Sequence, residues 1–362
     1  MKNIYQITED VSFNSGGVRT VLINLDDFIN SSNINKSSIL TNFKEKTDSY
    51  LVFKPNNLKI WNYSLNYQKY LHSKISEIDV LHLHGVFMHP QFASSKLALQ
   101  NNVPFIISPH GMLEPWHLND KKIKKELYLK FILHKMLAKS NFLHAITPLE
   151  KENLFKLTNH KNIFEIPNFI YHSKIPKEIN YNPSEEYFLF LGRIHPKKGL
   201  DLLIESMMKI ENKKIKLKIV GEENQYSNEL KKICEKHNLN NRVEFLGSVY
   251  GDDKYNLYSN AKAFVAPSYS EAIGMVNLEA AVCKTPVITT YNTGINPDWN
   301  LNGGVMINTN TKELILALND ASNWSQKERN ERGNLLSTYV INNYSWEEKG
   351  HLWTEAYNNL KI

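Results

Sequence analysis

Short runs of β-branched and aromatic residues alternate with helical stretches along the chain, and this alternation restricts the fold more than any other feature. Such sequences form parallel sheets covered by helices, because each parallel strand needs a crossover connection to reach the next. The first half predicts strands at Asn3–Ile7, Ser37–Thr41, Val80–Leu83, Phe105–Ser108, Phe142–Ile146 and Ile163–Ile166. Between them it predicts helices at Val18–Ile29, Leu65–Ser76, Gln91–Gln100, Lys121–Lys139 and Pro148–Leu157.

The alternation stops at Ser173–Glu186, which is polar, contains two prolines and shows no sustained period, so we expect a linker there. The pattern then restarts, with strands predicted at Tyr187–Leu191, Lys216–Val220, Val243–Leu246, Ala263–Ala266 and Val287–Thr289. The helices predicted here are Leu200–Met208, Asn228–His237, Asp253–Ser259, Gly274–Cys283, Lys312–Ala321 and two more after Gln326, ending with Trp346–Leu360. We therefore expect two Rossmann-like doubly wound α/β domains, residues 1–175 and 176–340, facing a central cleft.

The stretch after the strand at Ala263–Ala266 contains the most informative polar residues. A turn bearing Glu271 leads into a helix near Gly274, whose first backbone N–H groups lack acceptors and form an anion site. These amides belong to Ile273, Gly274, Met275 and Val276. Glu279, about one turn further on, is placed to hold the vicinal hydroxyls of a ribose. The alternative is that Glu271 caps the helix and Glu279 is a solvated surface residue.

A basic loop follows the strand at Tyr187–Leu191. Gly192 frees the chain at the strand end, and Arg193 and Lys198 are both placed to reach a diphosphate. Charge-assisted hydrogen bonds of this kind contribute about 1.5–3 kcal/mol each. The alternative is an ordinary solvated basic turn.

The first half has glycines and histidines where strands end. Gly16-Gly17 lies between the first strand and the first helix and can present amides to a phosphate or an acceptor, although the chain has no G-x-G-x-x-G fingerprint. His82, His84 and His110 follow two further strands. No carboxylate or cysteine accompanies them at metal-ligand spacing, so we expect no metal site.

The formal net charge of +6 favours an anionic partner. No DNA-binding motif is present and the lysines alternate with aliphatic residues, so we expect no nucleic-acid partner. Two cysteines in separate segments, no apolar run of bilayer length and a polar N-terminus without signal-peptide character point to the cytoplasm.

Taken in order, these residues resemble the retaining glycosyltransferases of family 4, which have the GT-B fold. Glu271, seven residues and Glu279 match the paired-glutamate motif of that family. The other matches are Gly192-Arg193 and Lys198-Gly199 in the donor-phosphate loop, and Gly16-Gly17, His84-Gly85 and His110-Gly111 in N-domain turns. Residues 341–362 look like the family's terminal helix, which crosses back to the first domain. Ala272-Ile273 departs from the family motif and leaves sugar selectivity open.

The resemblance implies a metal-independent, cofactor-free transfer of a hexose or N-acetylhexosamine from a UDP- or GDP-sugar, with retention. The reaction would be a same-face displacement in which the leaving phosphate helps to deprotonate the acceptor. His110, Glu271, Arg193 and Lys198 would be the catalytic residues. Donor binding would fall to Arg193, Lys198, Glu279, the amides of residues 273–276 and Gly16-Gly17. A nucleotide-sugar epimerase or hydrolase of the same fold, and a non-catalytic nucleotide-sugar-binding protein, are the alternatives.

Ser108–Trp116 and the lysine-rich stretch after it look like bacterial polysaccharide-assembly transferases, which make capsule, O-antigen or exopolysaccharide. This implies a saccharide acceptor linked to polyprenyl diphosphate and peripheral contact with the anionic inner face of the cytoplasmic membrane. Lysines flanking an apolar face that includes Phe131 and Leu133 fit such contact. The alternative is a solvated helix whose apolar stripe packs on the core.

Overall fold

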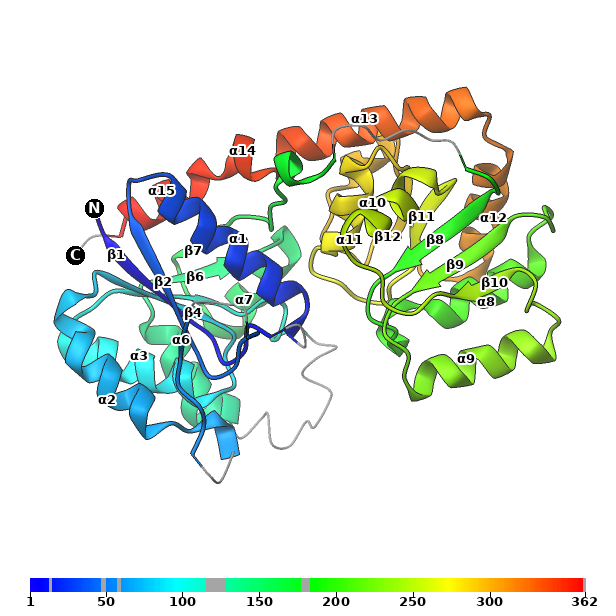
Figure 1. The fold of residues 1–362 in the computed structure, drawn as a ribbon. Helices are drawn as coiled ribbons and strands as arrows, with labels where there is room; N and C mark the ends of the chain where they lie inside the picture. Colours follow the sequence, from blue (N-terminus) through cyan, green and yellow to red (C-terminus); the bar gives the residue numbers. More distant parts are fainter. Residues whose placement is uncertain (13–14, 47–49, 57–59, 115–127, 177–182, 361–362) are drawn as a thin grey trace. The chain divides into compact units, whose positions relative to one another are not determined.

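The computed structural model describes residues 1–12, 15–46, 50–56, 60–114, 128–176 and 183–360. The chain forms two compact units, one made of Met1–Phe169 with Gly350–Ile362 and the other of Ile170–Lys349 (Figure 1). We call them the N-unit and the C-unit. The C-terminal segment therefore belongs to the same unit as the first strand.

The N-unit contains a parallel sheet of seven strands in the order β3-β2-β1-β4-β5-β6-β7. The strands are β1 (Asn3–Ile7), β2 (Lys36–Thr41), β3 (Leu51–Val52), β4 (Val80–His84), β5 (Phe105–Ser108), β6 (Phe142–Ala145) and β7 (Ile163–Glu165). The helices are α1 (Gly17–Ser31), α2 (Leu65–Lys74), α3 (His89–Asn101), α6 (His134–Lys139), α7 (Pro148–Thr158) and α15 (His351–Asn358). The strand order reverses between β1 and β4, which is where such sheets bind ligands.

The C-unit repeats this plan with six parallel strands in the order β10-β9-β8-β11-β12-β13. The strands are β8 (Tyr187–Leu191), β9 (Lys216–Val220), β10 (Val243–Phe245), β11 (Ala263–Ala266), β12 (Val287–Thr290) and β13 (Val305–Ile307). The helices are α8 (Leu200–Lys209), α9 (Gln225–Lys236), α10 (Gly251–Asn260), α11 (Met275–Val282), α12 (Thr311–Asn323), α13 (Gln326–Tyr344) and α14 (Trp346–Lys349). Here the order reverses between β8 and β11.

Burial explains why these segments form central strands. All five residues of β8 are buried, as expected for a parallel strand with helices on both faces. All five residues of β4 are buried too, but two of them are histidines. The centre of the N-unit sheet therefore holds polar groups that need hydrogen-bond partners inside the protein.

The two parallel sheets with interleaved helices confirm the predicted fold class. Three details of the prediction were wrong. The short strands β3 and β13 were not predicted, and Trp346–Leu360 is broken into α14 and α15. Phe131 and Leu133 do not share a face: Leu129–Leu133 is a π-helix in which Leu133 is fully buried and Phe131 is 69% exposed.

The rest of the predicted helix at Lys121–Lys139 divides into two parts. Residues 121–127 lie outside the described residues, and His134–Lys139 forms α6. Within the described ranges, no helix combines the length and the apolar character that crossing a bilayer requires.

Candidate functional site

The basic loop and the paired-glutamate loop meet in the C-unit because β8 and β11 are adjacent parallel strands. The two loops are also hydrogen-bonded to each other, since the amide of Tyr269 donates to the Lys197 carbonyl at 2.9 Å. Gly199 has a φ of +69°, and a Cβ there would lie 2.1 Å from the Pro267 carbonyl oxygen. Only glycine permits this approach. The turn therefore brings Lys198 next to the start of the glutamate loop.

Lys198 and Glu271 form an ion pair, and their side chains are 18% and 20% exposed. Burial of this degree strengthens the electrostatic attraction while leaving the pair within reach of a ligand. Arg193 belongs to the same loop and is exposed. Among the described residues, its guanidinium has no ion-pair partner within 4.0 Å.

Helix α11 begins directly after this pair. Its N-cap is Gly274, and no side chain caps it. The alternative in which Glu271 caps the helix is therefore wrong, because that carboxylate binds Lys198 instead. Ile273 and Gly274 are buried and Met275 and Val276 are half-buried. The first amides of a helix have no intrahelical acceptor, so this end of α11 offers donors to an anion.

Glu279 is held one helix turn further along α11. Its carboxylate lies 2.7 Å from Nζ of Lys254 and accepts a hydrogen bond of 3.0 Å from the Tyr258 hydroxyl. The side chain is 16% exposed, so the alternative of a solvated surface residue is wrong. The structure does not join Glu279 to Lys198, since each has its own partner. Lys254 and Tyr258 come from α10 and were not predicted, because nothing in their spacing indicates which face of α10 meets α11.

The diglycine lies at the start of α1 in the N-unit. Gly16 is the N-cap, with a φ of 61° that favours glycine, and no side chain caps the helix. A Cβ on Gly16 or Gly17 would meet no atom within 4 Å among the described residues. This start of a 15-residue helix therefore leaves room for a ligand near its amides.

His110 occupies a tight turn after β5, with a φ of 54°. Glu150 fixes this turn: it accepts hydrogen bonds of 2.8 Å from the amides of Gly111 and Ile146. Burial raises the pKa of the Glu150 carboxyl to about 7, against the two amide hydrogen bonds that lower it. Glu150 was not predicted, although Thr147-x-x-Glu150 has the spacing of a capping box; its carboxylate supports the histidine turn instead.

Four histidines lie together at the carboxyl edge of the N-unit sheet. Nδ1 of His84 is 2.8 Å from Nε2 of His110, and His82 stacks at a tilt against His84. His144, which was not predicted, joins them through Ser108. Burial lowers the pKa of all four imidazoles, to about 3 for His110 and about 4 for His144. Within the described residues, no three His, Cys, Asp or Glu side chains are arranged so that they could hold a metal ion.

Glu9 and Gln91 lie beside these histidines at the β1–β4 reversal and were also not predicted. The Gln91 amide donates to Glu9 at 2.5 Å and to the His84 carbonyl at 2.6 Å. Burial raises the pKa of the Glu9 carboxyl. A side chain on Gly85, whose φ is +83°, would touch both residues.

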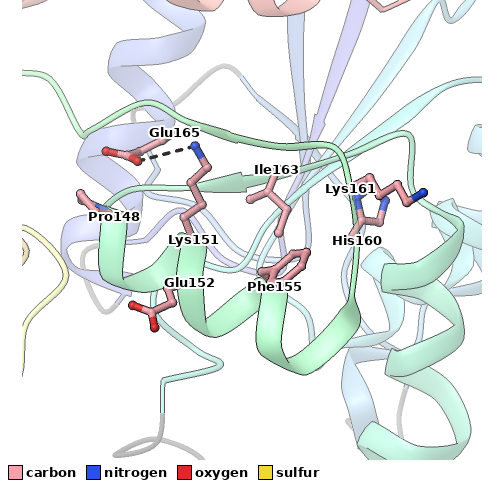
Figure 2. A pocket seen from close by; sticks show the side chains of 8 residues that line it. All are labelled: Pro148, Lys151, Glu152, Phe155, His160, Lys161, Ile163 and Glu165. Atoms are coloured by element: carbon pink, nitrogen blue, oxygen red, sulfur yellow. Dashed lines mark ion pairs between the residues drawn. The ribbon is translucent and has the colours of Figure 1, made fainter.

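A shallow hollow of about 340 Å³ runs along α7 beside the edge strand β7 (Figure 2). It is lined by Pro148, Lys151, Glu152, Phe155, His160, Lys161, Ile163 and Glu165. Lys151 and Glu165 face each other across it at 3.9 Å. The hollow contains none of the predicted site residues.

These two strand-end sites on a pair of doubly wound sheets define a protein with the GT-B fold. The model of "Glycosyltransferase Family 4" matches residues 35–174, and that of "Glycosyl transferases group 1" matches residues 172–334. The chain therefore belongs to the family-4 glycosyltransferases.

Two curated relatives illustrate the sequence similarity. An uncharacterized glycosyltransferase of Methanocaldococcus jannaschii is 30% identical over 198 residues, covering 51% of this chain and 47% of the relative. The O-antigen chain mannosyltransferase RfbU of Salmonella typhimurium is 28% identical over 179 residues, covering 49% and 50%. The matches thus span about half the length of each relative.

Solved structures share the fold over the whole chain. Sucrose-phosphate synthase from Thermosynechococcus elongatus superposes with a TM-score of 0.83 at 18% identity, covering 99% of both chains. Anabaena HepE, solved in complex with UDP-glucose, has a TM-score of 0.80 at 15% identity, covering 99% of this chain and all of that one.

Proposed function

We propose that the protein transfers a hexose or N-acetylhexosamine from a nucleoside-diphosphate sugar to a saccharide acceptor, without a metal and with retention of configuration. The observation that carries the proposal is the Lys198–Glu271 pair beside the N-terminus of α11, at the β8–β11 reversal. A cation and free amides at one point fit a diphosphate. Family membership and the UDP-glucose complex of the structural neighbour HepE support this reading.

In this proposal Arg193 and Lys198 bind the diphosphate and stabilise the charge that develops on it as it departs. Glu271, released from Lys198, and the amides of residues 273–276 hold the transferred sugar. Glu279 accepts from the ribose hydroxyls, and its existing bonds to Lys254 and Tyr258 keep the carboxylate in place.

The N-unit supplies the remaining contacts. His110 contacts the transferred sugar, and Gly16-Gly17 approaches the donor phosphate or the acceptor. The leaving phosphate takes the proton of the attacking hydroxyl on the same face of the sugar. The α-anomer of a donor would then give an α-linked product.

We further propose that the acceptor is a lipid-linked saccharide in surface-polysaccharide synthesis, the kind of process in which the relative RfbU acts by name. Its lipid would place the enzyme on the inner face of the cytoplasmic membrane. The lysines that suggest this contact (Lys121, Lys122, Lys124 and Lys125) lie outside the described residues. Flotation with anionic vesicles tests it: replacing the four lysines by serine should abolish salt-sensitive binding, and binding that is indifferent to the change would contradict it.

The donor site is tested by thermal-shift measurements with UDP, GDP, ADP and their sugars, because stabilisation by a ligand follows its affinity. A donor that raises Tm is then incubated with saccharide acceptors, and the anomeric configuration of the product is read by NMR. Free sugar without an acceptor product would identify a hydrolase, and an epimerised donor an epimerase. Binding without turnover of any acceptor would leave a nucleotide-sugar-binding protein.

A further inference from the structure

An unbroken chain of hydrogen bonds runs through the N-unit and ends at His110. It joins, in order, the Ile166 carbonyl, His144, Ser108, His82, Tyr357, Gln6, His84 and His110. The successive donor–acceptor distances are 2.7, 2.7, 2.6, 2.7, 3.2, 2.7 and 2.8 Å. Seven consecutive contacts at hydrogen-bond distance make this a connected network, whose members support one another.

The sheet and the last helix bring these groups together. Gln6 pairs in register with His82 across β1 and β4, and His84 pairs with Ser108 across β4 and β5. Helix α15 covers this face, with Trp353 packed against the ring of His82 and Tyr357 bonded to it. Tyr357 of the C-terminal segment, remote in sequence, thus links the two halves of the hydrogen-bond chain.

The imidazoles of the chain are neutral. Every side chain of the hydrogen-bond chain other than His110 is at most 1% exposed: Gln6, His82, His84, Ser108, His144 and Tyr357. Burial lowers the pKa of each imidazole below its ordinary value of 6.5. A neutral imidazole donates from one ring nitrogen and accepts at the other.

The Ile166 carbonyl sets the direction of the whole chain, because it can only accept. Nε2 of His144 therefore carries a hydrogen, and Nδ1 accepts from the Ser108 hydroxyl. The Ser108 oxygen then accepts from Nε2 of His82. Nδ1 of His82 in turn accepts from Tyr357.

The same rule carries the direction beyond Tyr357. The phenol oxygen accepts from the Gln6 amide nitrogen, and the Gln6 carbonyl accepts from Nε2 of His84. Nδ1 of His84 is then left to accept from Nε2 of His110. All four histidines are consequently Nε2–H tautomers. His110 is half-buried, and no group among the described residues donates to its Nδ1.

We propose that this oriented chain fixes the tautomer of His110 and presents its Nδ1 lone pair as an acceptor for a hydroxyl of the transferred sugar, with Tyr357 as a positioning residue. The identity of the ligand rests on the proposed function, whereas the orientation of the chain does not. Tyr357 acts at a distance: without its hydroxyl, Gln6 can rotate and turn its amide hydrogens toward His84. That rotation reverses both bonds that follow and places the hydrogen of His110 on Nδ1.

The test is NMR of the full chain labelled with 15N-histidine, because protonated and unprotonated ring nitrogens resonate far apart. Without any ligand, His82, His84, His110 and His144 should all be protonated at Nε2. In Tyr357→Phe we expect His110 to populate both tautomers. We also expect kcat/KM for the nucleotide sugar to fall about three- to tenfold, the effect of losing one hydrogen bond between neutral groups.

Trp353→Phe is the matched control, since Trp353 packs on the same rings without belonging to the chain. It should leave the His110 tautomer and kcat/KM unchanged; an equal loss in this variant would assign the effect to packing and overturn the proposal. Should Tyr357→Phe fail to fold, Ser108→Ala breaks the chain on its other side and should release the same reversal.

Two results separate this inference from the proposed function. A wild-type His110 protonated at Nδ1, or a Tyr357→Phe spectrum identical to wild type, overturns the inference even if the enzyme transfers sugar. The expected tautomers without turnover of any nucleotide sugar overturn the proposed function alone.

Discussion

At the carboxyl ends of its strands the C-unit pairs lysines with glutamates, whereas the N-unit links neutral imidazoles, an amide and two hydroxyls. The C-unit pairs, Lys198–Glu271 and Lys254–Glu279, are 16–22% exposed. Apart from half-buried His110, the N-unit groups bonded to His84 and His82 are at most 1% exposed. One strand-end site is thus ionic and reachable, and the other is neutral and enclosed except at His110.

The difference predicts how each site responds to a ligand. The Lys198–Glu271 pair is only partly buried, and a diphosphate offers Lys198 charge-assisted hydrogen bonds in place of those from Glu271, so the two anions can exchange. Breaking the buried chain would leave unsatisfied polar groups, at about 1–3 kcal/mol each. We therefore expect the C-unit site to exchange partners on binding and the N-unit site to remain as it is.

The largest effect should come from Lys198→Ala, which removes the cation from the exchangeable pair. We expect kcat/KM to fall about 10- to 100-fold, corresponding to the loss of about 1.5–3 kcal/mol of charge-assisted bonding. Lys209→Ala is the control, since Lys209 is 54% exposed and, among the described residues, pairs with Glu205 of its own helix. Steady-state kinetics measure both; a wild-type rate for Lys198→Ala would remove the donor-site assignment.

The next effect concerns His144 in the N-unit site and is measured as a change in the free energy of unfolding. The folded-state pKa of His144, about 4, lies below its ordinary value of 6.5. The free energy of unfolding therefore keeps the full contribution of neutral His144 above pH 6.5 and loses it as the pH falls through about 4. His144→Gln should remove up to about 1.4 kcal/mol per pH unit of this acid dependence. Exposed His72 provides the control variant, His72→Gln.

Urea unfolding between about pH 7 and pH 5 measures the slope for each protein. Equal slopes for wild type and His144→Gln would show that His144 is not held neutral in the folded state.

Much of the fold was readable because parallel strands carry a local signal. The segment Tyr187–Leu191 is uniformly apolar, and the structure makes it a strand with the predicted bounds. The strand β13, three residues at the edge of the sheet, was missed since it is too short to show a period. The break at Gly350 escaped prediction too, because the apolar spacing continues through it.

The site residues could be predicted only where they lie in or just after a loop that follows a strand. Arg193, Lys198, Glu271 and Glu279 follow strand ends in order, so their neighbourhood could be predicted from topology. The hydrogen-bond and ion-pair partners of these residues could not be predicted. Tyr258 meets Glu279, and Tyr357 meets His82, only through packing between distant segments.

A smaller effect is expected for Glu279, which in our proposal binds the ribose while Lys198 binds the diphosphate. Glu279→Gln keeps an oxygen for Tyr258 but loses the charge that binds ribose hydroxyls strongly. We expect the preference for the ribonucleotide donor over its 2′-deoxy analogue to fall about three- to tenfold, with kcat changed less than KM. Competition between the two donors measures the preference, and Glu244→Gln, which removes a surface ion pair with Lys216, is the control. An unchanged preference would place the ribose elsewhere.

A further effect on stability should come from Glu150, which supports the His110 turn. Its folded-state pKa of about 7 exceeds the ordinary 4.5, so its contribution is fully present below 4.5 and is lost as pH rises through about 7, opposite in sign to that of His144. Glu150→Gln should flatten this alkaline loss by up to about 1.4 kcal/mol for each pH unit between about 4.5 and 7. The free energy of unfolding at about pH 5 and pH 8 measures it. A wild-type slope in Glu150→Gln would mean that the turn holds this carboxylate as a charged acceptor throughout, and the N-unit site would then contain one permanent charge among its neutral groups.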